Sequence, residues 1–435
     1  MLVAMVHVRS SPAACSVVAA LAAALIGCGN EDVSLPCAGA VCAGSTTGGG
    51  GAGGGEPAIE CPASGVYHGP WVIRPTETGA SIRWDACAEG PAGVVITPEA
   101  GGADTAVAGT QTASEVKTRY DVSASVPPDL PGTYWLTEAV ATGLEPGRCY
   151  RYRLDADDTL GGRFCTSRPS GDPLVFMGIG DTNPALGATD GVLAYPLAQN
   201  PDFTLHMGDI QYYASVFESY VVWFPIMQPM LSQGAFLPVV GNHESELPHE
   251  FEDYYLRYWG GAAEGPRPED FHYASAGVHF FGVDTELSLD EGSEQAEWLV
   301  AALDEAQKTP GFRFSVVTMH KTLITCGDTS QDSGARDYLE PIFKLRGVRL
   351  VLQGHMHGYE RFEADGLTYI TTGGGGGALG DVDANVADRP EQAAIRAAAF
   401  ASYNAVTFEV GPGTLVATVT DDSGAILDGF SHPVP

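Results

Sequence analysis

The chain has 435 residues and a formal net charge of −32, from 22 Lys and Arg against 54 Asp and Glu. Such an acidic balance argues against nucleic-acid binding through a basic surface, because contacts to phosphates need clustered Lys and Arg. Hydrophobic residues make up 44% of the chain and charged residues 17%, which is enough apolar material for two folded domains. An anionic substrate would have to be attracted locally, and bound metal ions can do this.

The first 27 residues read as an export signal. Residues 12–27 form an apolar run that follows a mildly basic start and is short for a membrane span. The run ends in LIGC at Cys28, which resembles a bacterial lipoprotein signal peptide with acylation of the Cys28 thiol. The alternative is an ordinary secretory signal with an incidental cysteine. Both predict an exported protein, and the first predicts a lipid anchor in the outer membrane, because Gly29 is not the Asp that retains lipoproteins at the inner membrane.

Residues 28–60 are rich in glycine and predict a flexible linker between the anchor and the folded domains. A tether of this length has an r.m.s. reach of about 30 Å.

Cysteine usage agrees with export. Of the nine cysteines, Cys15 and Cys28 belong to the signal and the anchor, so seven remain, and most should pair in an oxidising compartment. Cys149 and Cys165 flank a predicted hairpin and suit a cross-strand disulfide. Because seven is odd, one thiol is left over, and Cys326 is the candidate since it stands alone in the second domain. The remaining suggested pairs are Cys61 with Cys87 and Cys37 with Cys42.

Residues 61–168 predict an all-β domain. Short strand-like segments alternate there with turn signals such as PTETG, GLEPG and DDTLGG, a spacing typical of a β-sandwich. The segment GLEPGRCYRYRL resembles the penultimate strand of fibronectin type III domains, in which a Tyr packs at the corner. The domain could be a spacer or binding module, but packing against the catalytic domain is the favoured interpretation.

Residues 171–435 contain five apolar segments that each end in polar side chains. Buried strands read as continuous apolar runs, and in open α/β sheets the site lies beyond the carboxyl ends of the strands. Seven oxygen and nitrogen donors are therefore predicted to converge on one sheet edge, which is enough for two metal ions. The segments are LVFMGIGD ending at Asp181, FTLHMGDIQY with Asp209 and Tyr212, FLPVVGNHE with Asn242, FRFSVVTMH ending at His320, and VRLVLQGHMH with His355 and His357.

The donor types limit the metals. Carboxylate, amide, imidazole and phenolate groups suit Fe, Mn or Zn, and the absence of Cys from the set argues against a thiolate site. His355 and His357 alternate by two, so each ring can reach a different ion. A bridging carboxylate would hold two ions at roughly 3.5–4 Å, the separation used for in-line phosphoryl displacement.

In this order, GD, GDxxY, GNHE, a lone His and GHxH followed by YER resemble the purple acid phosphatases of the calcineurin-like metallophosphoesterase superfamily. Tyr212 best separates these phosphatases from the rest of the superfamily, most members of which lack a Tyr three residues after the second Asp. The resemblance implies an α/β (α+β) fold, a four-layer sandwich of two mixed sheets flanked by helices, preceded by an all-β, fibronectin type III-like sandwich. It implies that a ferric ion is held by Asp181, Asp209, Tyr212 and His357, and a divalent Zn, Mn or Fe ion by Asn242, His320 and His355, with Asp209 bridging.

The resemblance also implies a reaction. A metal-bound hydroxide would attack a phosphate monoester in line, and His243 would face the phosphate, binding it or protonating the leaving alkoxide. A Tyr212 phenolate on iron would colour the protein. Relatives carry further histidines between the lone His and GHxH, whereas residues 321–354 contain none. Lys321, Arg336 or Cys326 could take the place of these missing histidines, or His243 could act alone.

Two alternatives to a monoesterase remain. One is a metallophosphodiesterase or nucleotidase with Zn or Mn, and the other is a surface binding protein with a structural metal centre. The complete donor set together with His243 favours an enzyme acting on small phosphate esters, because a structural site needs no open coordination position.

Other residues are expected to have structural roles. Residues 293–309 predict a helix with Ser293 as its N-cap. The glycine run 373–377 follows a predicted strand, and the sequence leaves open whether it is a mobile wall of the site or a loose connection. The remaining residues with predicted supporting roles are His206 and His279 in strands, Asp284 in a turn, and Glu360 and Arg361 beside the last motif.

Overall fold

The computed structural model describes residues 61–116, 132–183, 187–210, 212, 220–245, 254–261 and 265–435. These residues belong to the unit Gly55–Pro435. The predicted signal peptide and glycine linker, and the suggested pair of Cys37 and Cys42, lie outside the described residues. Within the described ranges, no helix combines the length and apolar character needed to cross a membrane.

The described residues between 61 and 168 form an all-β arrangement, as the sequence predicts. Its strand order is β1-β2-β5-β4-β3-β6-β7. The first residues of β4 pair with β3 and the rest pair with β5, so β4 links the two halves. The strands are β1 (Val66–Ile73), β2 (Ala80–Ala86), β3 (Gly93–Pro98), β4 (Thr105–Val116), β5 (Gly132–Ala141), β6 (Cys149–Leu154) and β7 (Gly161–Cys165).

Two of the predicted disulfides are present. Cys149 and Cys165 are bonded across β6 and β7, and Cys61 is bonded to Cys87. Cys326 is free and buried, as expected. At the start of β6, the hydroxyl of Tyr150 accepts a hydrogen bond from the backbone N–H five residues earlier, at 2.9 Å. This hydrogen bond ties Tyr150 to the turn before its strand.

The rest of the chain forms two sheets. One has the order β20-β19-β18-β8-β9-β10 and the other β11-β12-β13-β14-β16-β15-β17. Strands β8 to β10 are parallel, and so are β12, β13, β14 and β16, whereas the outer strands are antiparallel, so both sheets are mixed. Their bounds are β8 (Leu174–Ile179), β9 (Phe203–His206), β10 (Ala235–Pro238), β11 (Phe271–Ser275), β12 (Val278–Gly282), β13 (Phe314–Thr318), β14 (Val348–Gln353), β15 (Tyr359–Ala364), β16 (Leu367–Thr372), β17 (Arg396–Phe400), β18 (Ala405–Val410), β19 (Thr414–Thr420) and β20 (Ile426–Pro433).

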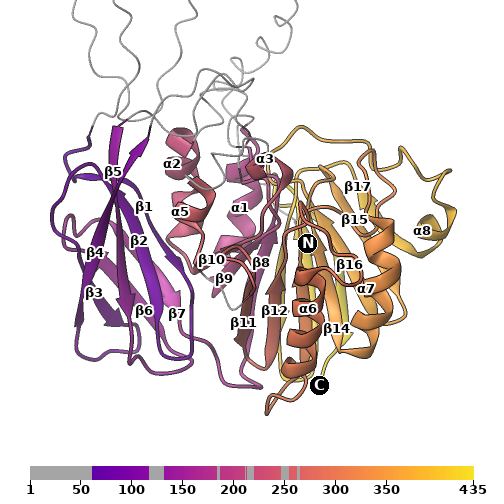
Figure 1. Cartoon of the computed structure of the whole chain (residues 1–435), viewed down its shortest axis with the longest axis horizontal. Coiled ribbons are helices and arrows are strands. Elements are labelled where there is room, and N and C mark those ends of the chain that lie inside the picture. Colours follow the sequence, from indigo (N-terminus) through magenta and orange to yellow (C-terminus); the bar gives the residue numbers. More distant parts are fainter. Residues whose placement is uncertain are drawn as a thin grey trace, which may run out of the picture. The chain divides into compact units, whose positions relative to one another are not determined.

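Helices cover the outer faces of these sheets. The inner faces share one apolar core, in which Phe176 and Phe203 of one sheet meet Phe280 of the other. Helices α1 and α2 share a second core with β8 and β10, and α6 and α7 share a third with β12 to β14; Figure 1 shows α6 and α7 lying along the latter sheet. The predicted four layers are therefore present. The helices are α1 (Thr189–Ala198), α2 (Tyr220–Leu231), α3 (Asn242–Ser245), α5 (Leu256–Tyr258), α6 (Glu294–Ala306), α7 (Ser333–Leu345) and α8 (Pro390–Ile395).

Helix α6 confirms the predicted helical segment and its start. The Ser293 hydroxyl accepts a hydrogen bond from the Ala296 N–H at 3.3 Å, which satisfies one of the free donors of the first turn. Leu299, Leu303 and Ala306 are buried on the face that meets the sheet. The amphipathic spacing in the sequence is thus sufficient to place this helix.

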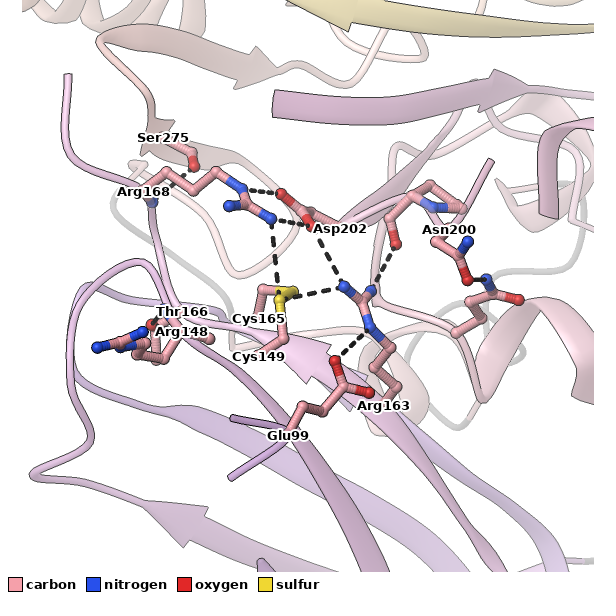
Figure 2. A network of polar contacts seen from close by, with 12 residues as sticks. Glu99, Arg148, Cys149, Arg163, Cys165, Thr166, Arg168, Asn200, Asp202 and Ser275 are labelled. Carbon is pink, nitrogen blue, oxygen red and sulfur yellow. Dashed lines mark hydrogen bonds and ion pairs between the residues drawn. A yellow bond between two sulfur atoms is a disulfide. The ribbon is translucent and has the colours of Figure 1, made fainter. Parts of the chain in front are cut away.

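The sequence does not predict how the all-β region joins the rest of the chain. Strand β1 pairs in parallel with β10, so one continuous sheet of 13 strands runs through both. Beside this junction, the Arg168 guanidinium binds the Asp202 carboxylate through two nitrogens, and Arg163 lies 3.8 Å from the same carboxylate. Figure 2 shows both guanidinium groups between Asp202 and the disulfide of Cys149 and Cys165.

Candidate metal centre

Three of the predicted site residues share an unusual backbone conformation. Asp181, Asp209 and His355 follow β8, β9 and β14, and their φ angles are 57°, 50° and 65°. Residues other than glycine seldom adopt positive φ, and such strain is concentrated at functional sites. Since β8 and β9 belong to one sheet and β14 to the other, the site lies where strand ends of both sheets meet.

One half of the site is centred on His320. Ligand-type atoms of Asp181, Asp209 and His320 lie within 4.8 Å of one another, and all three side chains are buried. His320 Nε2 lies 3.4 Å from Asp209 Oδ2 and 3.0 Å from Asn242 Oδ1. The ring of His355 lies 5.0 Å from that of His320. Asn242, His320 and His355 thus gather on one side of Asp209.

The other half is centred on His357. Its Nε2 lies 3.0 Å from the Tyr212 hydroxyl and 3.4 Å from Asp181 Oδ1. Asp181 also accepts hydrogen bonds from the backbone N–H of His355 at 3.0 and 3.1 Å. All seven predicted donors therefore lie in one connected group.

Hydrogen bonding fixes how His320 presents its ring. Its Nδ1 lies 2.7 Å from the carbonyl oxygen of Met207, which can only accept, so Nδ1 carries the proton. Burial lowers the pKa of His320 to about 3, so the ring is neutral and Nε2 holds a lone pair. That lone pair faces the Asp209 carboxylate. Two acceptors facing each other in a buried site form an arrangement that a cation stabilises.

The carboxylates of the site also fit a cation. Burial raises the pKa of Asp209 well above its usual range, and the nearby charges of Asp181 and Glu244 add to this effect. In His357, burial acts to lower the pKa, but the hydrogen bond and charge of Asp181 outweigh it and raise the pKa to about 9. Negative charge is therefore in excess among these buried groups, and bound cations reverse such local pKa shifts.

Glu244 is a site residue for which the sequence predicted no role. Its buried carboxylate accepts hydrogen bonds from the backbone N–H groups of Asp209, Ile210 and Gly241 at 2.9, 2.8 and 2.8 Å. It thereby ties the loop after β9 to the loop after β10. The available signal was its place in GNHE, two residues after Asn242 and at the start of the short helix α3.

The glycine run at 373–377 is a packed wall of the site. A Cβ atom on Gly377 would lie 2.8 Å from a ring carbon of His357 and 3.0 Å from the Tyr212 hydroxyl. A Cβ atom on Gly373 would lie 2.8 Å from Asp181 Oδ2. Glycine is therefore needed here because the backbone approaches the donors closely. The run is therefore a closely packed wall, and not the loose connection that the sequence left open.

His243 lies at the partly exposed side of the group. Its side chain is 28% exposed, and its Nε2 lies 3.8 Å from Asp209 Oδ2. Its ring centre lies 4.4 Å from that of Tyr212, and its backbone N–H donates to Asp209 at 3.0 Å. The imidazole can therefore reach a molecule that enters from solvent.

The three candidates for the missing histidine differ in their surroundings. Arg336 lies on α7 and binds Glu340 at 2.8 Å. Cys326 is fully buried, and burial raises the pKa of its thiol. Lys321 follows His320 directly, is one-third exposed, and its Nζ lies 2.8 Å from Glu286. Lys321 is therefore the candidate whose charge is close to the donors.

Several residues have the supporting roles predicted for them. His206 is buried, and its Nε2 lies 3.1 Å from the Thr182 hydroxyl. Asp284 closes a turn by accepting a hydrogen bond from the N–H two residues further on, at 2.7 Å. Glu360 is buried and accepts a hydrogen bond from the Cys326 N–H at 3.0 Å. These contacts brace the loops that carry the site.

Comparison with known proteins agrees with this geometry. Residues 174–359 match the calcineurin-like phosphoesterase family. Purple acid phosphatase 15 of Arabidopsis thaliana is 26% identical over 287 residues, which are 54% of this chain and 52% of that protein. An uncharacterized protein of Mycobacterium tuberculosis is 29% identical over 307 residues, 61% of this chain and 55% of that protein. The chain thus spans about half the length of these relatives.

A solved structure shares the fold over most of the chain. The purple acid phosphatase from seeds of yellow lupin (Lupinus luteus) superimposes with a TM-score of 0.68 at 17% identity, covering 83% of this chain and 73% of that one. At this identity the similarity establishes the fold, and the chemistry has to be argued from the residues themselves.

Proposed function

We propose that this chain, a calcineurin-like metallophosphoesterase with purple acid phosphatase homologues, is a dinuclear metal phosphatase that hydrolyses phosphate monoesters. The observation that carries the proposal is the gathering of all seven predicted donors, four of them buried and three partly buried, into one group at the strand ends. A purely structural metal site would need neither two halves nor a partly exposed histidine beside them.

The two halves of the group suggest how two ions are held. Asp181, Tyr212 and His357 would hold a ferric ion, since a phenolate favours Fe(III). The divalent ion, Zn, Mn or Fe, would be held by Asn242, His320 and His355, with Asp209 between the two. Such a centre supplies a nucleophile at acidic pH and neutralises charge on the phosphate. The carbonyl groups that fix His320 and His357 orient both rings before any metal binds.

Two side chains are proposed to handle the substrate. His243 Nε2 would donate a hydrogen bond to a phosphate oxygen, or a proton to the leaving alkoxide, from its partly exposed position beside Asp209. Lys321 would add a positive charge at the same side and is oriented by Glu286. Because residues 373–377 are glycines, no side chain from this segment covers the donors.

We further propose that the protein is exported and anchored by lipid at Cys28, in the outer membrane. The support is the signal-like start of the chain and the two disulfides of the β-sandwich, since disulfides persist in oxidising compartments. Labelling with a radioactive fatty acid tests the anchor: the wild type should be labelled and a Cys28→Ala variant should not. Label retained in the variant would refute lipidation at Cys28.

The decisive experiment measures metal content, the visible spectrum and hydrolysis of para-nitrophenyl phosphate from acidic to neutral pH on the same sample. Bound iron, a purple colour and activity are expected. Tyr212→Phe should abolish the colour, whereas the matched change Tyr338→Phe on α7 should not. A colourless enzyme with two Zn or Mn ions that cleaves diesters would favour the phosphodiesterase alternative, and absence of bound metal would refute the catalytic proposal.

A further inference from the structure

The segment 254–261 contacts both the all-β region and strand β10, which leads into the candidate metal centre. Helix α5 ends within this segment, where the backbone N–H groups of Trp259 and Gly260 donate to the carbonyl groups of Tyr255 and Leu256 at 2.8 and 2.9 Å. The last carbonyl groups of a helix have no donor within the helix, and each needs another partner when it is buried. Here the partners come from the all-β region.

Arg83 on β2 supplies most of these partners. Its Nη1 lies 3.0 Å from the carbonyl oxygen of Tyr258, 3.1 Å from that of Gly260 and 3.4 Å from that of Arg257. Its Nε donates to Glu138 on β5 at 2.9 Å, which fixes the direction of the guanidinium group. Hydrogen bonds from a charged donor are stronger than those between neutral groups, and Arg83 is only 6% exposed, so water cannot readily replace it.

Two further side chains of the all-β region hold the same segment. Asp85, which follows Arg83 on β2, is fully buried and accepts a hydrogen bond from the Arg257 guanidinium at 2.9 Å. The indole N–H of Trp71 on β1 donates to the Tyr258 carbonyl oxygen at 3.4 Å. Buried charged pairs are costly to break, because each partner would be left in an apolar environment. The segment is therefore tightly held on the side of the all-β region.

On its other side the segment contacts β10. The ring centre of Trp259 lies 4.8 Å from that of Phe236, and the Tyr255 hydroxyl donates to the carbonyl oxygen of Pro238 at 3.2 Å. Both Phe236 and Pro238 belong to β10, and the loop that follows this strand carries Asn242. A shift of the segment would therefore move the strand end from which that loop departs.

Tyr255 also links the segment to the carboxylate that ties two loops of the candidate metal centre. Burial raises the pKa of Tyr255 well above its usual range, and the charge of Glu244 adds to this effect, so the two side chains are close. Glu244 in turn accepts hydrogen bonds from the backbone N–H groups of Asp209 and Gly241. Contacts thus connect the all-β region, through segment 254–261, to the loops after β9 and β10.

We propose that Arg83 is a positioning residue for the candidate metal centre. By binding the carbonyl groups at the end of α5, it holds segment 254–261 against β10 and so orients the loop that carries Asn242 and His243. The all-β region is then a required support of the site and not an independent module. The expected effect on catalysis rests on the proposed function, whereas the coupling itself can be measured on metal-free protein.

Hydrogen–deuterium exchange of the metal-free full chain tests the coupling. In Arg83→Gln, peptides that contain Trp259 and Gly241 should exchange about tenfold faster than in the wild type, because local opening of both segments becomes easier. Peptides from β14 in the other sheet should exchange as in the wild type. Arg74→Gln is the matched control and should also behave like the wild type, since Arg74 binds the same Glu138 but donates to no carbonyl group of the segment among the described residues.

Activity and metal binding of the same preparations test the positioning role. Arg83→Gln should lower kcat about tenfold and weaken binding of the divalent ion by a similar factor, because Asn242 is misplaced. The purple colour should remain, since Tyr212 and His357 lie in the other half of the site. A wild type without metal or activity would refute the proposed function but would leave the exchange result valid.

Tyr255→Phe tests the same link with a smaller change, so it decides the matter if Arg83→Gln does not fold. It removes only the hydroxyl that donates to Pro238, and exchange of the peptide containing Gly241 should rise about threefold. The proposal is overturned if both variants exchange like Arg74→Gln, if exchange in Arg83→Gln rises equally in all strands, or if folded Arg83→Gln keeps the kcat of an active wild type.

Discussion

The candidate metal centre and a cavity lined by Arg151 and Arg153 of β6 are both polar, but their side chains are held in different ways. At the metal centre, His320 and His357 each donate to a backbone carbonyl, and Asp181 accepts from a backbone N–H. At the cavity, Arg151 and Arg153 each have one acidic neighbour and remain largely exposed. A site whose donors are fixed by the backbone is pre-organised for chemistry, whereas exposed arginines with one acidic neighbour each are not. The variants below test whether backbone anchoring matters at the candidate metal centre.

Asp209→Asn should have the largest effect. The change keeps the size of the side chain but removes the charge that would lie between the two ions, so we expect phosphatase activity to fall by about three orders of magnitude and metal binding to be lost. Melting temperature without metal should not fall, since burial and the charges of Asp181 and Glu244 disfavour this carboxylate. Activity assays, metal analysis and thermal melts of one preparation measure all three.

Asp365→Asn is the control for this variant. Asp365 has a similar left-handed φ of 53°, and its side chain is 94% exposed. The same substitution in the same backbone conformation should leave activity and metal content unchanged. Equal activity in Asp209→Asn and the wild type would show that the centre is structural.

Glu244→Gln tests whether the backbone anchoring of the metal centre matters. The variant can still accept from some of the three N–H groups, but it loses the charge that strengthens these hydrogen bonds. Changes in groups that orient metal ligands typically cost about 10- to 100-fold in metal affinity or activity, and we expect a loss in that range. Glu409→Gln on β18, which is exposed, is the control. Metal titrations followed by activity assays measure this loss. A fall in the melting temperature without a loss of metal affinity or activity would show that Glu244 has only a structural role.

The sequence predicted which residues gather at the candidate metal centre better than it predicted long-range contacts elsewhere, because the signal for these residues lies within single short segments. Each donor directly follows an apolar strand, and parallel strands bring their carboxyl ends together, so linear order sufficed to place Asp181, Asp209 and His320. The cavity combines Arg151 with Gln233, which are 82 positions apart and meet only through the junction of β7 with the catalytic part. The pattern of residues within a single segment cannot predict such a contact. Glu244 was missed for the same reason, since its partners are backbone groups of another loop.

Lys321→Met addresses the histidine that is missing from residues 321–354. If Lys321 attracts the phosphate, its loss should raise KM for para-nitrophenyl phosphate about threefold to tenfold, with little change in kcat, because the charge acts on binding. The effect should shrink at high salt. Arg336→Met is the control, since Arg336 is paired with Glu340 on α7. A rise in KM in the Arg336 variant alone would reverse the assignment of these two residues.

His279 is a buried histidine outside the candidate metal centre. Changing it should have the smallest effect of the variants considered. Burial, together with the neighbouring His272, lowers the pKa of His279 to about 4, against about 6.5 for an unperturbed histidine. Between these values the unfolded chain binds a proton that the folded chain does not. The free energy of unfolding should therefore fall as the pH drops from 6.5 towards 4, by an amount on the order of 1 kcal/mol.

Thermal melts from pH 7.5 to 4.5 of the wild type and His279→Asn measure this contribution. The variant should be less stable at pH 7.5 but should lose less stability on acidification, whereas His432→Asn, which changes a partly exposed histidine near Glu363, should follow the wild type. Parallel curves for all three proteins would mean that His279 does not carry this pH dependence. Such a result would leave other groups whose pKa is lowered in the folded chain, such as the buried His206, to account for any acid sensitivity.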